Sequence, residues 1–309
     1  MSRVPDQTTC LGTTASAGDA WLFEAIGTAW RIDADRALDE HDRAAVAERV
    51  ERFDRDWSRF RADSLVSTIA AATDGGTWAL PDDAAPLLAL FARLHALSRG
   101  RVSPLVGASL ERLGYDAAYR LRPAGEPLPA PEWEELLDLT TDHAGAVRLT
   151  TRRPVLLDVG AAGKGHLVDI VGDLLAARGA TETVVDGSGD IRHRGGAGIR
   201  IALENPANPT KAIGVVELRD AALCASSPSR RAWGEGLHHI IDAVTGRPVD
   251  GVIGTWAVAP TALEADGLAT ALFLAEPREL EAEFAFSWAR MFSDGRLEAS
   301  ANWEGELFR

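Results

Sequence analysis

A glycine-rich turn that contains a lysine is the first segment whose residue types could carry chemistry. Residues 158–165 read DVGAAGKG; they begin inside the apolar run 154–159, which predicts a buried strand, and lead into a helix predicted over 165–178. Lys164, one of only two lysines in the chain, would add positive charge where a helix N-terminus offers unpaired N–H groups to a phosphate. A tight strand-to-helix turn with a solvated lysine fits the same string, so both interpretations stay open.

A second turn combines glycine with carboxylates. Residues 186–191 read DGSGDI and follow a strand predicted over 183–185. Such a turn could place its acidic side chains beside a ligand or a cation, and a plain hairpin turn is the alternative.

Two adjacent histidines open the third segment, where residues 238–248 read HHIIDAVTGRP. Neighbouring side chains on a strand point to opposite faces, so at most one of His238 and His239 can face a given site. That histidine could act as a general base. A hairpin that carries surface histidines would give the same pattern.

The fourth segment, residues 264–272, reads EADGLATAL on a helix predicted over 263–274. Asp266 and Thr270 are four residues apart, so their oxygens lie on one helix face among small neighbours. A carboxylate and a hydroxyl suit a hard cation such as Mg²⁺. An aspartate that complements the helix dipole, beside a buried threonine, is the alternative.

Composition limits the classes of protein to consider. The 309 residues are 46% hydrophobic and 25% charged, as in a folded globular protein, and the net charge of −14 argues against nonspecific binding to nucleic acid or anionic lipid. No apolar run reaches the roughly 18 residues of a membrane span. Residues 1–18 are polar and resemble neither a signal peptide nor, around Cys10, a lipoprotein anchor. We therefore predict a flexible tail over 1–18 and a cytoplasmic protein without a membrane anchor.

The remaining elements must position these segments. Apolar periodicity predicts helices over 38–60, 82–98 and 278–292 and a strand over 23–32, and strands alternate with helices in the second half. The pattern indicates a mixed α/β fold in which mixed sheets are flanked by helices. No linker interrupts residues 19–309, so we expect one compact unit of one or two lobes.

The order of the four segments resembles the ApbE-type FAD:protein FMN transferases, whose usual strings are close to DLGGIAKG, GGDI, HIIDPxTGxP and ADALATA. Residues 26–28 (IGT), 57–60 (WSRF), 64–67 (SLVS) and 102–114 also resemble family segments. The resemblance covers about residues 23–273, and the last two strings are the most specific.

The resemblance implies a reaction. The family splits FAD and transfers its FMN half, through a phosphoester bond, to a Ser or Thr hydroxyl of an acceptor protein; AMP leaves and Mg²⁺ is needed. The family's usual acceptor motif is DGxTGAT. Positioning and charge neutralisation supply most of the rate in such phosphoryl chemistry.

The resemblance also implies roles for single residues. His239 would be the base that takes the acceptor's proton. Mg²⁺ would be bound by Asp266, Thr270 and the backbone carbonyl of Ala161. FAD would be held by Ile26, Phe60, Arg101, Val102, Ser103, Asp158, Lys164 near the pyrophosphate, and the Ile240 backbone.

The chain departs from the family strings at several positions of the expected FAD pocket. Ala243 and Val244 stand where the family has proline and a basic residue. The other replacements are Ile26 for Met, Ala70 for Asn, Ser103 for Asp and Ser188 for Gly.

Two alternatives to the transferase share these residues. One is an FAD pyrophosphatase that passes FMN to water, and the other is a non-catalytic FAD-binding protein. The replacements at 243 and 244 favour the binding protein, whereas Asp266, Thr270 and His239 favour an enzyme.

Overall fold

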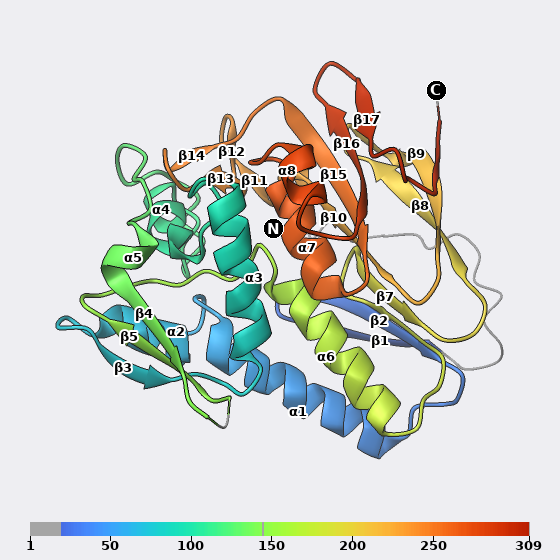
Figure 1. The fold of residues 1–309 in the computed structure, drawn as a ribbon, viewed down its shortest axis with the longest axis horizontal. Coiled ribbons are helices and arrows are strands. Elements are labelled where there is room, and N and C mark those ends of the chain that lie inside the picture. Colours follow the sequence, from blue (N-terminus) through green and yellow to red (C-terminus); the bar gives the residue numbers. More distant parts are fainter. Residues whose placement is uncertain (1–19, 144, 309) are drawn as a thin grey trace.

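An eight-stranded sheet, in which every strand is antiparallel to its neighbours, forms the centre of the fold (Figure 1). The computed structural model describes residues 20–143 and 145–308, so the predicted tail over 1–18 lies outside it. The strands, in spatial order, are β1 (Trp21–Ala25), β2 (Thr28–Ala34), β6 (Thr183–Asp186), β7 (Asp190–Arg194), β10 (Ala222–Ser226), β15 (Val252–Ala259), β16 (Ser287–Phe292) and β17 (Leu297–Ala299).

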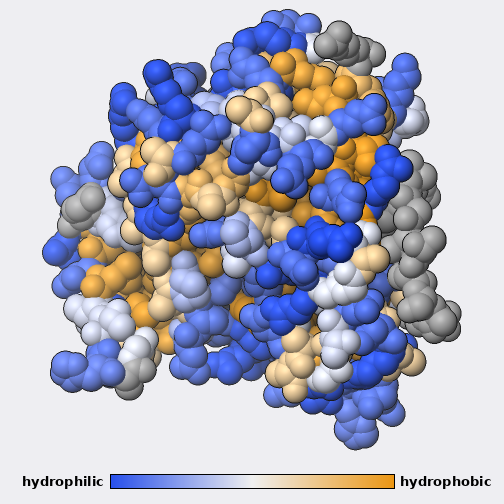
Figure 2. Space-filling view, turned by 45° about the vertical axis from the view of Figure 1, so that its right-hand side comes forward, coloured by the Kyte–Doolittle hydropathy of each residue, from blue (hydrophilic) through white to orange (hydrophobic). Residues whose placement is uncertain are grey.

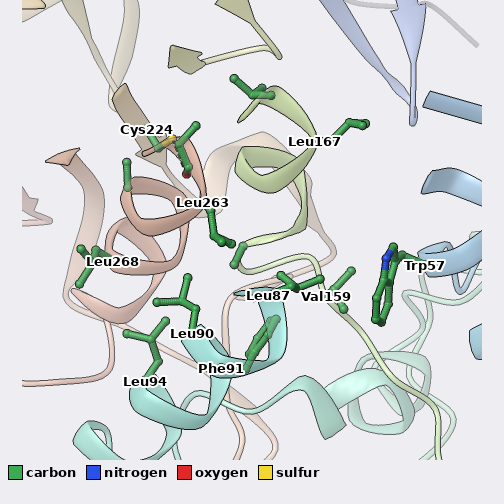
Figure 3. Close-up of a cluster of buried hydrophobic side chains, with 14 of the residues drawn as sticks. Trp57, Leu87, Leu90, Phe91, Leu94, Val159, Leu167, Cys224, Leu263 and Leu268 are labelled. Carbon is green, nitrogen blue, oxygen red and sulfur yellow. Dashed lines mark hydrogen bonds between the residues drawn. The ribbon is translucent and has the colours of Figure 1, made fainter. Parts of the chain in front are cut away.

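Helices cover one face of this sheet. Helices α6 (Gly163–Ala177) and α7 (Ala262–Ala271) pack against each other and against the central strands, and α1 (Glu40–Trp57) and α3 (Ala84–Leu97) lie outside them. Figure 3 shows the core between α3, α6 and α7, where Leu90, Leu167 and Leu268 are among the buried side chains.

A three-stranded sheet packs on the opposite face and consists of β8 (Ile199–Asn205), β9 (Asn208–Leu218) and β18 (Glu306–Leu307). Its Ile201 and Val216 share a core with Leu223 and Trp256, whereas Cys224 and Ala257, the next residues along β10 and β15, lie in the core under the helices. The two-residue period of a strand thus buries both faces of the central sheet.

The remaining elements are shorter. They are α2 (Leu65–Ala71), α4 (Gly107–Arg112), α5 (Trp133–Leu136), α8 (Pro277–Glu281), the 3₁₀ turns at Pro104–Val106 and Pro228–Arg231, the sheet of β3 (Gly76–Ala79), β5 (Val147–Thr151) and β4 (Leu137–Thr141), and the paired strands β11 (Ala232–Trp233) with β12 (Leu237–His238) and β13 (Ile241–Asp242) with β14 (Arg247–Pro248).

The mixed α/β class is confirmed, but three predicted elements differ from the structure. Residues 154–159 are extended and bury Val155, Leu157 and Val159, yet they pair with no strand. Buried and less buried side chains alternate because one side of this single chain segment faces the core. The predicted helix over 278–292 ends at Glu281 and gives way to β16, and 23–32 is a hairpin rather than one strand.

The hairpin turns at Ile26 and Gly27, whose φ angles are 45° and 75°. Both values lie in the left-handed region that a tight two-residue hairpin turn needs. Glycine adopts it freely, whereas Ile26 adopts it with strain.

The outer surface is mostly hydrophilic, in keeping with the net charge of −14. On the face in Figure 2, hydrophilic side chains surround smaller apolar areas. Within residues 20–143 and 145–308, no helix combines the length and apolarity that crossing a bilayer requires.

A buried histidine in α6 makes stability depend on pH. His166 is 5% exposed, hydrogen-bonds through Nε2 to the Asp83 carbonyl at 2.9 Å, and packs edge-on against Phe53. Burial lowers the pKa of His166 to about 4, so between pH 6.5 and 4 the unfolded chain binds a proton at this residue that the folded chain does not.

We therefore expect the free energy of unfolding to fall as the pH drops through that window, with His166 contributing about 2–3 kcal/mol of the loss by pH 4.5. His166→Gln should lose less. Urea unfolding of both proteins at pH 7 and pH 4.5 measures the difference, and an equal loss in the variant would contradict the assignment.

Candidate active site

The three expected cation ligands meet where α6 and α7 touch. Asp266 is 7% exposed on α7, and its Oδ2 accepts a hydrogen bond of 2.9 Å from the Gly165 N–H at the start of α6. One turn further along α7, the Thr270 hydroxyl donates to the Ala161 carbonyl at 3.3 Å. The contact therefore gathers a carboxylate, a hydroxyl and a carbonyl oxygen, which are hard donors of the kind that Mg²⁺ prefers.

The absence of a side chain at Gly165 permits this contact. A Cβ atom there would lie 2.1 Å from the Ala262 carbonyl oxygen and 2.6 Å from the Asp266 Cβ. The sequence reasoning treated this glycine as part of a phosphate-binding turn, whereas in the structure it lets two helices approach.

Within residues 20–143 and 145–308, no group of three or more His, Cys, Asp or Glu side chains is arranged to hold a metal ion. That result does not bear on a set with one carboxylate, because a hydroxyl and a backbone carbonyl supply its other oxygens.

Lys164 is held by groups of the β6–β7 turn. Its Nζ donates to the carbonyls of Gly187 and Ser188 at 2.6 and 3.1 Å and lies 3.0 Å from Asp190 Oδ2. The ammonium thus donates to two carbonyls and forms an ion pair with one carboxylate. Burial opposes the charge of Lys164, but Asp190 and Asp266 outweigh it and raise its pKa. These carboxylates explain why a cation is stable at a helix N-terminus.

The turn over 186–190 closes the β6–β7 hairpin, and its Gly187 and Ser188 carbonyls accept from Lys164. Gly189 N–H donates to Asp186 Oδ1 at 2.9 Å, and Ser188 and Gly189 have φ angles of 60° and 95°. Asp190, the second acidic residue of this string, is 1% exposed. Burial and the charge of Asp190 together raise the pKa of Asp266 well above its usual range.

The two histidines differ in the partners of their ring nitrogens. His238 is bound through Nε2 to the Val249 carbonyl at 2.9 Å and through Nδ1 to the Ile240 N–H at 3.3 Å. His239 Nδ1 is buried without a hydrogen-bond partner among the described residues. Burial, followed by the charge of Arg231, lowers the pKa of His239 to about 3. His239 is therefore neutral near pH 7 and has a nitrogen free to accept a proton.

Asp158 is already engaged by the protein. Its Oδ2 accepts from Arg59 Nε at 2.5 Å and its Oδ1 from the Gly160 N–H at 2.7 Å. Burial raises the pKa of Asp158, but Arg59 outweighs it and lowers the value. Arg59 is 4% exposed, and its Nη2 has no hydrogen-bond partner among the described residues. The sequence reasoning missed Arg59 although it precedes Phe60, because nothing local shows that it reaches Asp158.

An aromatic cluster surrounds Phe60. The Arg59 guanidinium lies 4.2 Å from the Phe60 ring centroid, and Tyr119 stacks on Phe60 at 5.3 Å. Tyr115 contacts Phe60 edge-on and stacks on Trp233. Such rings suit a planar conjugated ligand.

Three other residues expected to bind FAD lie on the segment 101–103. This segment is hydrogen-bonded to the segment 242–244. Arg101 bonds to Asp242 Oδ2 and to the Leu274 carbonyl, both at 2.8 Å. Val102 and Ser103 are buried, and a cavity of about 40 Å³ lies between Ser103 and the replaced positions Ala243 and Val244. Ile26 lies in the β1–β2 turn, and Ala70 lies in α2.

Gly165→Ala should lower the free energy of unfolding by about 1–3 kcal/mol, because the added methyl group must push α6 and α7 apart. Gly172→Ala is the matched control in the same helix, since its Cβ would meet only Val185 Cγ2 at 3.9 Å. We expect that control to gain roughly 0.5–1 kcal/mol from helix propensity. Urea unfolding measures both variants, and equal stabilities would contradict the close contact.

Known proteins resemble this chain over most of its length. The ApbE family model matches residues 26–287. An FAD:protein FMN transferase of Klebsiella pneumoniae is 24% identical over an alignment of 299 residues, and the match covers 89% of this chain and 84% of that protein. The flavin transferase ApbE from Vibrio cholerae has a TM-score of 0.74 at 23% identity and covers 91% of this chain and 96% of its own. The ApbE protein from Thermotoga maritima has a TM-score of 0.76 at 22% identity, and the match covers 92% of this chain and 98% of its own. The solved structures show the same fold, and, because the family model spans most of its length, the chain belongs to the ApbE family.

Proposed function

We propose that the chain is a Mg²⁺-dependent FAD:protein FMN transferase. The acceptor's Ser or Thr oxygen attacks the FMN phosphorus of FAD, the bridging P–O bond breaks, AMP leaves, and FMN stays on the acceptor as a phosphoester. The observation that carries the proposal is the meeting of Asp266, Thr270 and the Ala161 carbonyl at one contact. The printed name of the Klebsiella pneumoniae relative supports the reaction type.

The donors at the helix contact fit a divalent cation. All three are oxygens, and Asp266 is buried beside a second carboxylate, so burial and then Asp190 raise its pKa. Mg²⁺ bound there would neutralise charge on the pyrophosphate. The protein holds these oxygens in place by packing α7 against α6 and the turn that precedes it.

His239 is suited to take the acceptor's proton. A neutral imidazole with an unpartnered nitrogen can accept a proton at Nδ1. Burial, followed by the charge of Arg231, lowers the pKa of His239 and keeps the imidazole neutral before reaction, and the negative charge of Asp158 favours the imidazolium that forms.

FAD would lie along the surface between the helix contact and the aromatic cluster. We propose that Phe60 offers a stacking surface and that Asp158 acts by holding Arg59. Ile26, the segment 101–103 and the Ile240 backbone would complete the pocket, and Lys164 would contribute charge beside the pyrophosphate. The acceptor protein's motif and a cytoplasmic location stay predictions from the sequence.

The direct test is incubation with FAD and Mg²⁺, with EDTA as control, in the presence and absence of a DGxTGAT peptide. Release of AMP with FMN mass added to the peptide is the expected result. AMP with free FMN and an unlabelled peptide would indicate the pyrophosphatase, and intact FAD in every sample would indicate the binding protein.

Asp266→Ala should abolish Mg²⁺-dependent AMP release and leave the fold intact, because it removes the carboxylate ligand. Glu264→Ala, on the same helix, is the matched control and should keep activity. Circular dichroism checks folding, and chromatography measures AMP. Unchanged turnover in Asp266→Ala would remove the cation assignment.

His239→Ala should slow FMN transfer by about 10² to 10⁴ and leave FAD affinity nearly unchanged, as for loss of a general base. His238→Gln is the neighbouring control and should affect stability more than transfer, because His238 is bound on both ring nitrogens. Stopped-flow transfer rates and FAD titrations separate the two effects. Lost FAD binding with intact chemistry would make His239 a ligand contact.

A further inference from the structure

Asp190 has a buried carboxylate that the local fold does not use. It is the first residue of β7 and is 1% exposed, and neither oxygen has a partner in hydrogen-bonding geometry among the described residues. Its one close counter-ion is Lys164 Nζ, 3.0 Å from Oδ2. An ionised group costs several kcal/mol to bury, so a charge in this position needs an explanation.

The turn that carries Asp190 does not need the carboxylate. Gly187 N–H donates to the Asp190 backbone carbonyl at 2.8 Å, Gly189 N–H donates to Asp186 at 2.9 Å, and Ala225 N–H donates to the Gly189 carbonyl at 3.2 Å. These bonds hold the hairpin through its backbone and Asp186. The Asp190 side chain therefore acts on something other than the turn.

Buried carboxylates outnumber the ammonium around Lys164. Asp186, Asp190 and Asp266 are 6%, 1% and 7% exposed, and the charge of Lys164 acts on both Asp186 and Asp266. Strand β7, which begins at Asp190, packs against α7, which carries Asp266, the expected cation ligand. A divalent cation bound at Asp266 would therefore have the Asp190 carboxylate close by.

We propose that Asp190 is a positioning residue of the cation site: its negative charge, held in place by Lys164, strengthens binding of a divalent cation at Asp266. Lys164 on this view is chiefly the internal counter-ion of Asp190. The inference rests on the cation site of the proposed function. Neighbouring carboxylates of this kind typically change metal affinity by 10–100-fold when they are replaced.

The test compares two aspartates on elements that pack against α7. Asp190→Asn removes the charge with little change of shape. Asp169→Asn is the matched control, because Asp169 accepts from the Ala262 and Leu263 N–H groups at 2.9 and 2.8 Å and so holds the start of α7 without belonging to the cluster. Mn²⁺ affinity is measured by electron paramagnetic resonance for the full chain with and without FAD, and thermal unfolding confirms that each variant is folded.

We expect about 10–100-fold weaker Mn²⁺ binding in Asp190→Asn and near-unchanged binding in Asp169→Asn. AMP release by Asp190→Asn should return to the unsubstituted rate at high Mg²⁺, and FAD affinity in EDTA should not change. A purely structural role would lower the rate at every Mg²⁺ concentration.

Three results would overturn the inference. They are unchanged Mn²⁺ affinity in Asp190→Asn, an equal loss in Asp169→Asn, and a rate that high Mg²⁺ does not restore. Asp266→Asn separates this failure from failure of the proposed function. If Mn²⁺ binding depends on Asp266 but not on Asp190, only the further inference falls. If the unsubstituted protein binds no Mn²⁺ in either condition, or if Asp266→Asn binds it normally, the cation site of the proposed function falls as well.

Discussion

Helices α6 and α7 touch at Gly165 without a side chain between them, and the candidate active site depends on that contact. It brings the turn before α6, with the Ala161 carbonyl, against the face of α7 that carries Asp266 and Thr270. Glycine inside a helix costs about 1 kcal/mol relative to alanine. The packing of two helices against one sheet offsets that cost, and α3 closes the other side of α7 (Figure 3).

The buried charges of the site fall into two groups of opposite sign. Carboxylates outnumber the single ammonium around Asp266 and Lys164, which suits a cation. On the side of His239, the Arg59 guanidinium pairs with Asp158 but keeps an Nη2 without a hydrogen-bond partner among the described residues, and the charge of Arg231 acts on the histidine, which suits an anion. A phosphate ester that carries a bound divalent cation has both charges, so this separation agrees with the proposed chemistry on a pyrophosphate.

Local patterns predicted elements well where burial and hydrogen bonding follow the same period. Helices α1, α3, α6 and α7 appear where apolar spacing placed them. The same reasoning was wrong for residues 154–159, because alternating burial reports which side chains face the core and not whether a neighbouring strand exists. It was also wrong beyond Glu281, where apolar residues fill the core from a turn and from β16.

The sequence by itself determined the relations that depend on local geometry. Asp266 and Thr270 share a face because a helix repeats every 3.6 residues. Only the tertiary structure decided which distant groups meet. Arg59 engages Asp158 across 99 residues, and Lys164 turns toward Asp190 and the carbonyls of its turn. Such contacts follow from how the helices pack on the sheet, which no local period encodes.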